Sequence, residues 1–442
     1  MDDKWRQRQD GPKMKPGRDW KIWLAAAILG LAAPASAQLL GGHGGIVPNL
    51  PAPIQNLPGT VDNTLDRTTN TLDRTLDQTL DTATHDLVGR PLSSPLIARD
   101  ALGQRIVKGE VIAVSPSTDA LAAAGRLGLR IVRRDTLSGL GLSEIVFSTP
   151  DGMSADAALA ALRRADPNGS YDYDHLYDPS GEPVRIAAAD DGDAPDADDI
   201  RIGMIDGGID RRHPAFDDAR VVATNVVDQG TSPPSVHGTA VASLLVGEDG
   251  GFHGYLPGAT LFAADAYGGK PTGGAADDIV RALDWLAKND IAVANVSLAG
   301  PPNALLAAAV KAFVARGHVL VAAIGNGGPA APPAYPANYP GVIAVTSVDG
   351  SRRLEVDAGH GHVTFAALGV GVRAAARHGY QDYTGTSFAA PAVAARFALL
   401  MPEPDTASAA RALRQLADSA TPLGSAMGYG YLDGPNASLA GR

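Results

Sequence analysis

From residue 200 onward, short unbroken apolar runs alternate with longer segments in which apolar residues recur every three or four positions. The short runs are rich in β-branched and small apolar side chains, and they predict strands over 200–206, 259–266, 291–299, 318–326 and 342–349. The longer segments predict helices over 238–247, 275–290, 304–317 and 406–418, and one helix that begins after residue 387. Strands that are apolar on both faces are typical of a parallel sheet with helices on each side, so we expect an α/β domain over 200–442.

Residues 108–177 have a different rhythm. Strand patterns at 110–115, 129–137, 143–150 and 170–177 alternate with helical patterns at 117–128 and 154–166. The order β-α-β-β-α-β is that of the ferredoxin-like unit. We therefore expect a small ferredoxin-like α+β domain over 108–177, in which no catalytic residue types cluster.

The other segments lack such patterns. Residues 38–107 combine a Gly/Pro-rich stretch with a Thr-Leu-Asp repeat, which indicates a linker and spacer. The repeat also fits a self-association helix, because its leucines fall at spacings of seven and four (Leu65, Leu72, Leu76, Leu80 and Leu87). Residues 178–199 end in an aspartate-rich run and indicate a solvated linker, with a calcium loop as the alternative, although the spacing is not that of an EF-hand.

Residues 1–37 have the layout of a secretory signal. A basic residue precedes an apolar run, and Ala35-Ser36-Ala37 follows as a cleavage motif; Met14 is an alternative start. Pro34 ends the apolar run early, so no stable membrane span is expected. The sequence thus predicts a secreted or periplasmic protein.

Composition narrows the possible chemistry. The net charge of −11 argues against nucleic acid as a partner, and the absence of cysteine excludes disulfides, thiolate metal sites and cysteine nucleophiles. No cofactor and no metal site are expected beyond the open question of calcium. The histidines outside any motif are expected at the surface: His213, His253, His318, His360, His362 and His378.

Four polar residues stand at the ends of predicted elements: Asp206, His237, Asn326 and Ser387. Taken singly, each fits a turn or a helix cap; Ser387 in particular precedes an Ala-rich helix, with Pro391 expected in its first turn. In parallel sheets the ends of the strands line one crevice, so the four are expected to converge. Together they supply a serine nucleophile, a histidine base, a carboxylate that orients the base, and amide donors for an oxyanion.

The stretches "IGMIDGGID", "HGTAVASLLVG", "AAIGNGG" and "GTSFAAPAVAA" resemble the subtilisin-like serine proteases over residues 200–435. The resemblance implies a catalytic triad of Asp206, His237 and Ser387 and an oxyanion hole at Asn326. It also implies that Ser297, Leu298, Ala299 and Gly300 line the primary specificity pocket, and that Gly273 and Gly274 belong to an edge strand that pairs with an extended peptide. "DGG" departs from the usual Asp-Ser/Thr-Gly at the first strand.

The same resemblance implies that the ferredoxin-like domain is a propeptide, which chaperones folding and inhibits in cis until self-cleavage. Its tail, "DYDHLYDPSG", is expected in the active site, with self-cleavage near Tyr177–Asp178 and Tyr177 in the primary pocket. A permanently attached domain is the alternative. The sequence thus predicts an exported serine endopeptidase acting on polypeptides, with a preference for large apolar or aromatic residues. A non-catalytic binding protein on this fold, and an ester hydrolase or peptide ligase, are the other hypotheses.

Overall fold

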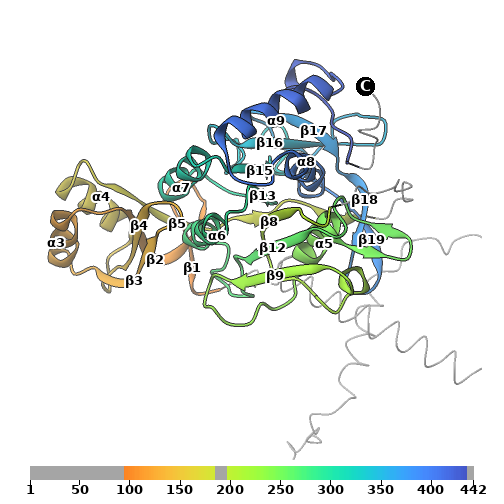
Figure 1. Cartoon of the computed structure of the whole chain (residues 1–442). Coiled ribbons are helices and arrows are strands. Elements are labelled where there is room, and N and C mark those ends of the chain that lie inside the picture. The colour runs from red at the N-terminus through yellow and green to blue at the C-terminus, as the bar shows by residue number, and fades with distance from the viewer. Residues whose placement is uncertain (1–93, 185–196, 436–442) are drawn as a thin grey trace, which may run out of the picture. The chain divides into compact units, whose positions relative to one another are not determined.

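The computed structural model describes residues 94–184 and 197–435 (Figure 1). The predicted signal peptide, the Thr-Leu-Asp repeat and most of the acidic linker lie outside these residues. Within the described ranges, no helix combines the length and the apolar character that crossing a bilayer requires.

The C-terminal domain (residues 197–435) is built on a seven-stranded parallel sheet with the order β17-β16-β15-β13-β8-β12-β9 (Figure 1). Its strands are β8 (Arg201–Asp206), β9 (Arg220–Asn225), β12 (Thr260–Asp265), β13 (Val293–Val296), β15 (Val319–Ala323), β16 (Ile343–Val348) and β17 (Phe365–Leu368). The five predicted strands are present, and the α/β fold is confirmed. The two strands of this sheet that were not predicted, β9 and β17, are its edge strands: β9 is largely exposed and mixes polar with apolar residues, whereas β17 is apolar and buried but only four residues long.

Helices cover both faces of this sheet. On one face lie α5 (Val236–Val246) and α8 (Thr386–Leu400), with α9 (Thr406–Ser419) packed against α8. On the other face lie α6 (Ala276–Lys288) and α7 (Ala304–Ala315). Along β8, Ile202 and Met204 pack in the first core and Ile205 in the second. Because side chains alternate along a strand, Asp206 points to the α5 face.

The ferredoxin-like domain (residues 97–175) is also confirmed. It contains β1 (Ile97–Arg99), β2 (Arg105–Val114), α3 (Thr118–Arg126), β3 (Arg130–Leu137), β4 (Leu142–Ser148), α4 (Ala155–Ala165) and β5 (Ser170–His175). The antiparallel order is β3-β4-β2-β5, and β1 also pairs with β2. Both helices begin at serine caps, Ser117 and Ser154, and they pack on one face of the sheet. β1 lies inside the linker expected over 38–107.

The other face of this sheet packs against α6 and α7. Ile112 of β2 belongs to the same buried cluster as the residues of these two helices. Asp172 accepts a hydrogen bond from the backbone N–H of Ala304 at 2.7 Å, at the start of α7. On α6, Asp284 accepts from the N–H of Gly139 at 2.8 Å. The two domains therefore share apolar and polar contacts.

Residues 176–184, which we call the cleft segment, are not the linker that the sequence predicted. β6 (Asp178–Pro179) pairs with β14 (Leu298–Ala299), and β7 (Glu182–Val184) pairs with β19 (Tyr380–Thr384), whose other neighbour is β18 (Val370–Ala375). The segment has turn-forming residues and no apolar alternation of its own. Its extended form depends on hydrogen bonds from strands of the C-terminal domain, which local sequence does not encode. The remaining short elements are β10 (Glu248–Asp249), β11 (Phe252–His253), η1 (Pro214–Phe216) and η2 (Ser425–Met427).

Two of the histidines expected at the surface are buried. His213 is 4% exposed, and its Nδ1 accepts from the N–H of Ala215 at the start of η1. His318 is 5% exposed, stacks on Phe313, and its Nδ1 lies 2.7 Å from the carbonyl of Ile291. The surface prediction was wrong for these two because each side chain satisfies a backbone group inside the fold. His360, His362 and His378 are exposed.

Candidate active site

Asp206 and His237 form a buried pair at the end of β8. His237 lies in the first turn of α5, which is capped by the side chain of Ser235. The Nδ1 atom of His237 is 2.9 Å from Oδ2 and 3.0 Å from Oδ1 of Asp206. Asp206 Oδ1 also accepts from the backbone N–H of Gly207 at 2.7 Å. The carboxylate therefore holds one ring nitrogen and leaves the other for different chemistry.

Glycines bring α5 close to the end of β8. A Cβ on Gly238 would lie 2.3 Å from the carbonyl oxygen of Gly207, and a Cβ on Gly208 would lie 2.2 Å from that of Pro233. Real Cβ atoms do not approach so closely, so larger residues would push the helix away from the strand. The "DGG" and "HG" motifs thus set the distance across which Asp206 reaches His237.

The second nitrogen of His237 faces the interior. His237 is fully buried, its ring lies 5.5 Å from that of Phe388, and within the described ranges its Nε2 has no hydrogen-bond partner. A buried polar atom without a partner is costly, so this nitrogen is available to a nearby hydroxyl.

Ser387 is the second residue of α8. Its Oγ donates to the carbonyl of Ser297 at 2.9 Å and accepts from the N–H of Ser180 at 3.1 Å. The hydroxyl is therefore bonded to the chain that occupies the cleft and to the strand that borders it.

Pro391 lies inside α8, not in the first turn as predicted, because the helix starts at Thr386. A proline has no N–H, so it cannot bond to the carbonyl four residues earlier, which is that of Ser387. The hydroxyl of Ser297 donates to this carbonyl at 2.9 Å and accepts from Asn295 Nδ2 at 2.9 Å. Ser297 thus completes the backbone hydrogen bonding that Pro391 leaves open.

We expect Ser297→Ala to lower the free energy of unfolding by about 1–3 kcal/mol, because it leaves buried polar groups unpaired. The measurement is the thermal midpoint in a Ser387→Ala background, with Ser351→Ala on an exposed turn as the control. Equal midpoints for the two serine variants would contradict this account.

The carbonyl of Ser180 is bonded to one amide group and lies near a second. It accepts from the backbone N–H of Ser387 at 2.9 Å. A Cβ on Gly385 would lie 2.4 Å from Asn326 Nδ2 and 2.9 Å from this same carbonyl oxygen, so the Asn326 amide and the carbonyl both lie against Gly385. Asn326 Oδ1 accepts from the N–H of Thr386 at 3.1 Å and from its Oγ1 at 2.9 Å, which orients the amide.

The structure therefore differs from the predicted placement of Tyr177 and Asp178. The residue whose backbone N–H and carbonyl bond to Ser387 is Ser180, which follows Tyr177 by three residues. The carbonyl of Tyr177 instead accepts from the hydroxyl of Tyr267 at 3.1 Å. Tyr177 was the obvious large side chain to place in a pocket, but strand pairing on both sides determines the register of the segment.

The predicted substrate-binding residues border the cleft segment. Leu298 and Ala299 form β14, opposite Pro179 and Asp178. Gly300 leaves room for a ring, because a Cβ there would lie 2.4 Å from Cδ1 of Tyr177. Gly273 and Gly274 lie in a turn and not in a strand, and the carbonyl of Gly274 accepts from the N–H of Tyr177 at 2.9 Å.

Asp265 is a buried carboxyl group that the sequence analysis did not single out. It ends β12 opposite Asp206 on β8, and burial raises its pKa, with Asp206 adding to the effect. Its position at a strand end, like that of Asp206, was the available signal. Asp265 lines a cavity of about 720 Å³, as does Gly207, the residue after Asp206. At Ser387, in contrast, the cleft segment is bonded to the hydroxyl.

The sequence profile of the subtilase family, Peptidase_S8, matches residues 197–431. The chain belongs to the subtilase family. Subtilisin DY from Bacillus licheniformis is 34% identical over 243 residues, which are 52% of this chain and 87% of that protein. Subtilisin E from Bacillus subtilis (strain 168) is 32% identical over 244 residues, or 52% of this chain, and the match covers 63% of subtilisin E.

The crystal structure of fervidolysin from Fervidobacterium pennivorans, described as a keratinolytic enzyme related to subtilisin, has a TM-score of 0.63. It covers 76% of this chain and 61% of fervidolysin at 18% identity, a likeness that concerns the fold. This structural match extends over more of the subtilase chain than the 52% covered by the subtilisins.

Proposed function

We propose that this subtilase is a serine endopeptidase that hydrolyses polypeptides through an acyl-enzyme at Ser387. One observation carries the proposal. The peptide carbonyl of Ser180 accepts a hydrogen bond from the N–H of Ser387, and the hydroxyl of Ser387 accepts one from the N–H of this same residue, Ser180. This is the position that a substrate carbonyl needs before attack.

In the proposed reaction, Ser387 Oγ turns from the Ser297 carbonyl to Nε2 of His237, which takes its proton as Oγ bonds to the substrate carbonyl carbon. His237 then gives this proton to the leaving amine as the C–N bond breaks. A water molecule, deprotonated by His237, next attacks the acyl group and releases Ser387. Asp206 keeps the imidazole in one orientation and stabilises its cationic form.

The negative charge of the tetrahedral intermediate falls on the former carbonyl oxygen. Two donors are proposed for it: the N–H of Ser387 and Nδ2 of Asn326, held by Thr386. Donors fixed in advance need no reorganisation during the reaction, so they stabilise this charge more effectively than water does.

A fluorophosphonate probe tests the proposal, because it reacts with an activated serine. We expect labelling of the mature protein that disappears in Ser387→Ala. No labelling, with a folded protein, would favour a binding protein on a subtilase fold. Labelling together with cleavage of esters but of no peptide in a library would favour an ester hydrolase.

We further propose that the ferredoxin-like domain acts as a propeptide, which supports folding and occupies the cleft until self-cleavage. The bond that lies at Ser387 is Ser180–Gly181, and a Cβ on Gly181 would lie 2.3 Å from the ring of Phe388. N-terminal sequencing of the active protein is expected to find Gly181 or a residue downstream of it. A mature chain that retains residues before 176 would indicate a permanently attached domain.

The cleft segment predicts substrate preference. Tyr177 is fully buried, its hydroxyl donates to the carbonyl of Pro301 at 2.8 Å, and it precedes the Ser180–Gly181 bond by three residues. In a peptide containing Tyr-Asp-Pro-Ser-Gly, tyrosine to alanine should lower kcat/KM about 100-fold through lost apolar burial. Tyrosine to phenylalanine should lower it about 5- to 10-fold through one lost hydrogen bond.

Replacing the peptide aspartate with asparagine is the matched control, because the Asp178 side chain is 54% exposed and pairs with Arg105 of the ferredoxin-like domain. Equal kcat/KM values for all four peptides would contradict this preference.

Export is proposed on the basis of residues 1–37. Protein recovered from the medium or the periplasm of the producing cells should lack these residues, as mass spectrometry of the Ser387→Ala chain would show. A chain that keeps them would oppose a cleaved signal.

A further inference from the structure

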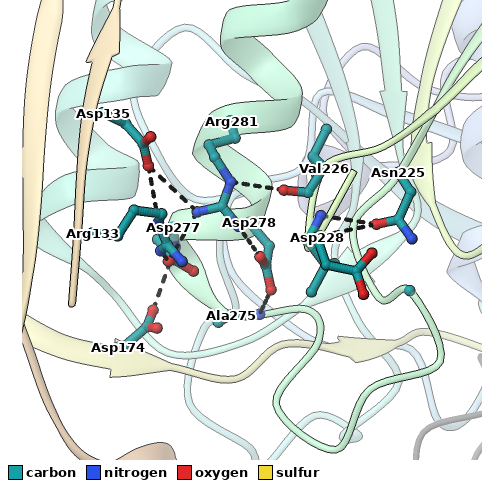
Figure 2. Close-up of polar contacts among 12 residues, drawn as sticks. Arg133, Asp135, Asp174, Asn225, Val226, Asp228, Ala275, Asp277, Asp278 and Arg281 are labelled. Atoms are coloured by element: carbon teal, nitrogen blue, oxygen red, sulfur yellow. Dashed lines mark hydrogen bonds and ion pairs between the residues drawn. The ribbon is translucent and has the colours of Figure 1, made fainter. Parts of the chain in front are cut away.

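A cluster of charged side chains lies where the ferredoxin-like sheet packs against α6 (Figure 2). Arg133 of β3 pairs with Asp277, and Arg281 lies 3.7 Å from Glu144 of β4 and 3.8 Å from Asp135 of β3. Arg281 also pairs with its helix neighbours Asp277 and Asp278 and donates to the carbonyl of Val226. Arg133 thus bridges from the ferredoxin-like domain to α6, and Arg281 bridges from α6 to the ferredoxin-like domain while it also pairs with neighbours on its own helix.

Carboxyl groups outnumber the guanidinium groups in this cluster. They come from five elements: Glu110 of β2, Asp135 of β3, Glu144 of β4, Asp174 of β5, and Asp277 and Asp278 of α6. Asp174 accepts from the N–H of Asp277 at 3.4 Å. Two cations cannot neutralise all of these groups if every carboxyl is ionised, so docking favours keeping some of them protonated.

Glu144 is the most constrained of these groups. It is fully buried, and neither of its carboxyl oxygens has a hydrogen-bond partner among the described residues. Its neighbours on β4, Ile145 and Phe147, pack in the core of the ferredoxin-like domain. By alternation Glu144 faces α6, so separation of the domains would expose it to water.

Burial raises the pKa of Glu144 to about 8, against the lowering effect of Arg281 and Arg133. Burial likewise raises the pKa of Glu110 to about 7, that of Asp278 to about 7 and that of Asp174 to about 6. These carboxyl groups have a pKa near 4 to 4.5 when they are exposed to water and a higher pKa when the domains are docked. At any pH between these two values, docking therefore takes up protons. Docking is therefore strongest below about pH 4.5 and weakens as the pH rises towards 8.

We propose that this cluster is a pH-sensitive latch, which holds the ferredoxin-like domain on the subtilase domain in acid and releases it as the pH rises through neutrality. The regulatory meaning rests on the proposed function, since only a propeptide needs release. The latch itself depends on the interface alone. The other titratable groups on this face are Asp172 and His175 of β5 and Asp284 and Lys288 of α6. Asp172, Asp284 and Lys288 make separate contacts with Ala304, Gly139 and one another. His175 bonds to Asn303 and also lowers the pKa of Asp174.

The test uses the full chain with Ser387→Ala and a recognition site for a sequence-specific protease inserted between residues 184 and 197. Cutting with that protease separates the domains covalently without any activity of the chain. The dissociation constant of the two parts is then measured at pH 5.5 and 8.5 by size-exclusion chromatography and titration. We expect it to be at least about tenfold higher at pH 8.5, since one unit of pKa shift corresponds to tenfold.

Glu144→Gln should reduce this pH ratio at least about threefold, and Glu110→Gln should reduce it as well. Asp151→Asn, on an exposed turn of the same domain, should leave it unchanged. Thermal midpoints at pH 5.5 verify that each variant folds. The same dissociation constant at both pH values, or a ratio untouched by both glutamine variants, would overturn the latch. Because no catalysis is measured, this result is independent of the fluorophosphonate result.

Discussion

Replacing His237 with alanine should lower kcat on a cleaved peptide about 10⁶-fold and leave the chain uncut at Ser180–Gly181. In subtilisin, removal of the triad histidine alone lowers kcat by about 2 × 10⁶, and that measured loss sets the scale. The physical reason is that a serine hydroxyl is a weak nucleophile until a base takes its proton. Here His237 is held at 2.9 Å by Asp206, its Nε2 has no hydrogen-bond partner among the described residues, and its ring packs 5.5 Å from that of Phe388, the residue after Ser387.

His213→Ala is the matched control, since His213 is also a buried histidine near a helix start but caps η1 outside the cleft. It should reduce thermal stability and keep kcat within a few-fold. Activity is measured on a peptide substrate, and mass spectrometry measures self-cleavage. A His237→Ala protein that is folded and keeps more than a thousandth of the activity would refute the assigned role.

Asn326→Ala should lower kcat about 10²- to 10³-fold with little change in KM. The Nδ2 donor is proposed to bind the oxygen most strongly when that oxygen is negatively charged, so its loss affects the transition state more than substrate binding. The steady-state parameters of the variant therefore separate the two effects. A rise in KM at constant kcat would mean that Asn326 only binds substrate.

Asn338→Ala provides the comparison. Asn338 also bonds to backbone groups, accepting from the N–H of His362 and donating to the carbonyl of Ala334. It lies outside the proposed oxyanion site, so kcat should stay within a few-fold. Asn326→Asp adds a stricter test, because it keeps the acceptor for Thr386 and replaces the donor with a carboxyl oxygen.

Much of the fold could be predicted from local patterns. The central strands and the helices over both faces have apolar periodicities strong enough to assign, and Ser117 and Ser154 mark the starts of the helices in the ferredoxin-like domain. The edge strand β9 was missed because it is largely exposed and mixes polar with apolar residues, and β17 because it is only four residues long. The burial of His213 and His318 was missed because their backbone partners, Gly379 and Ile291, are distant in sequence.

For the candidate site, too, one part could be predicted from the sequence and another could not. Asp206 and Asn326 end predicted strands, His237 and Ser387 come directly before predicted helices, and the order of parallel strands predicts that the four meet. The family resemblance predicted that the tail reaches the active site, but the register of the cleft segment could not be predicted, because β14 and β19 determine it by hydrogen bonds between backbones. The reach of Ser297 to the carbonyl left free by Pro391 is likewise a contact between remote segments.

By itself, therefore, the sequence determined the two folds, the family and the residue types available for acyl transfer, since these follow from periodicity and from short motifs with local geometry. Only the tertiary structure decided that Ser180, and not Tyr177, lies at Ser387, and that acidic groups from separate strands meet Arg281 on one helix. Both outcomes depend on register and on burial, which arise when distant parts of the chain come together.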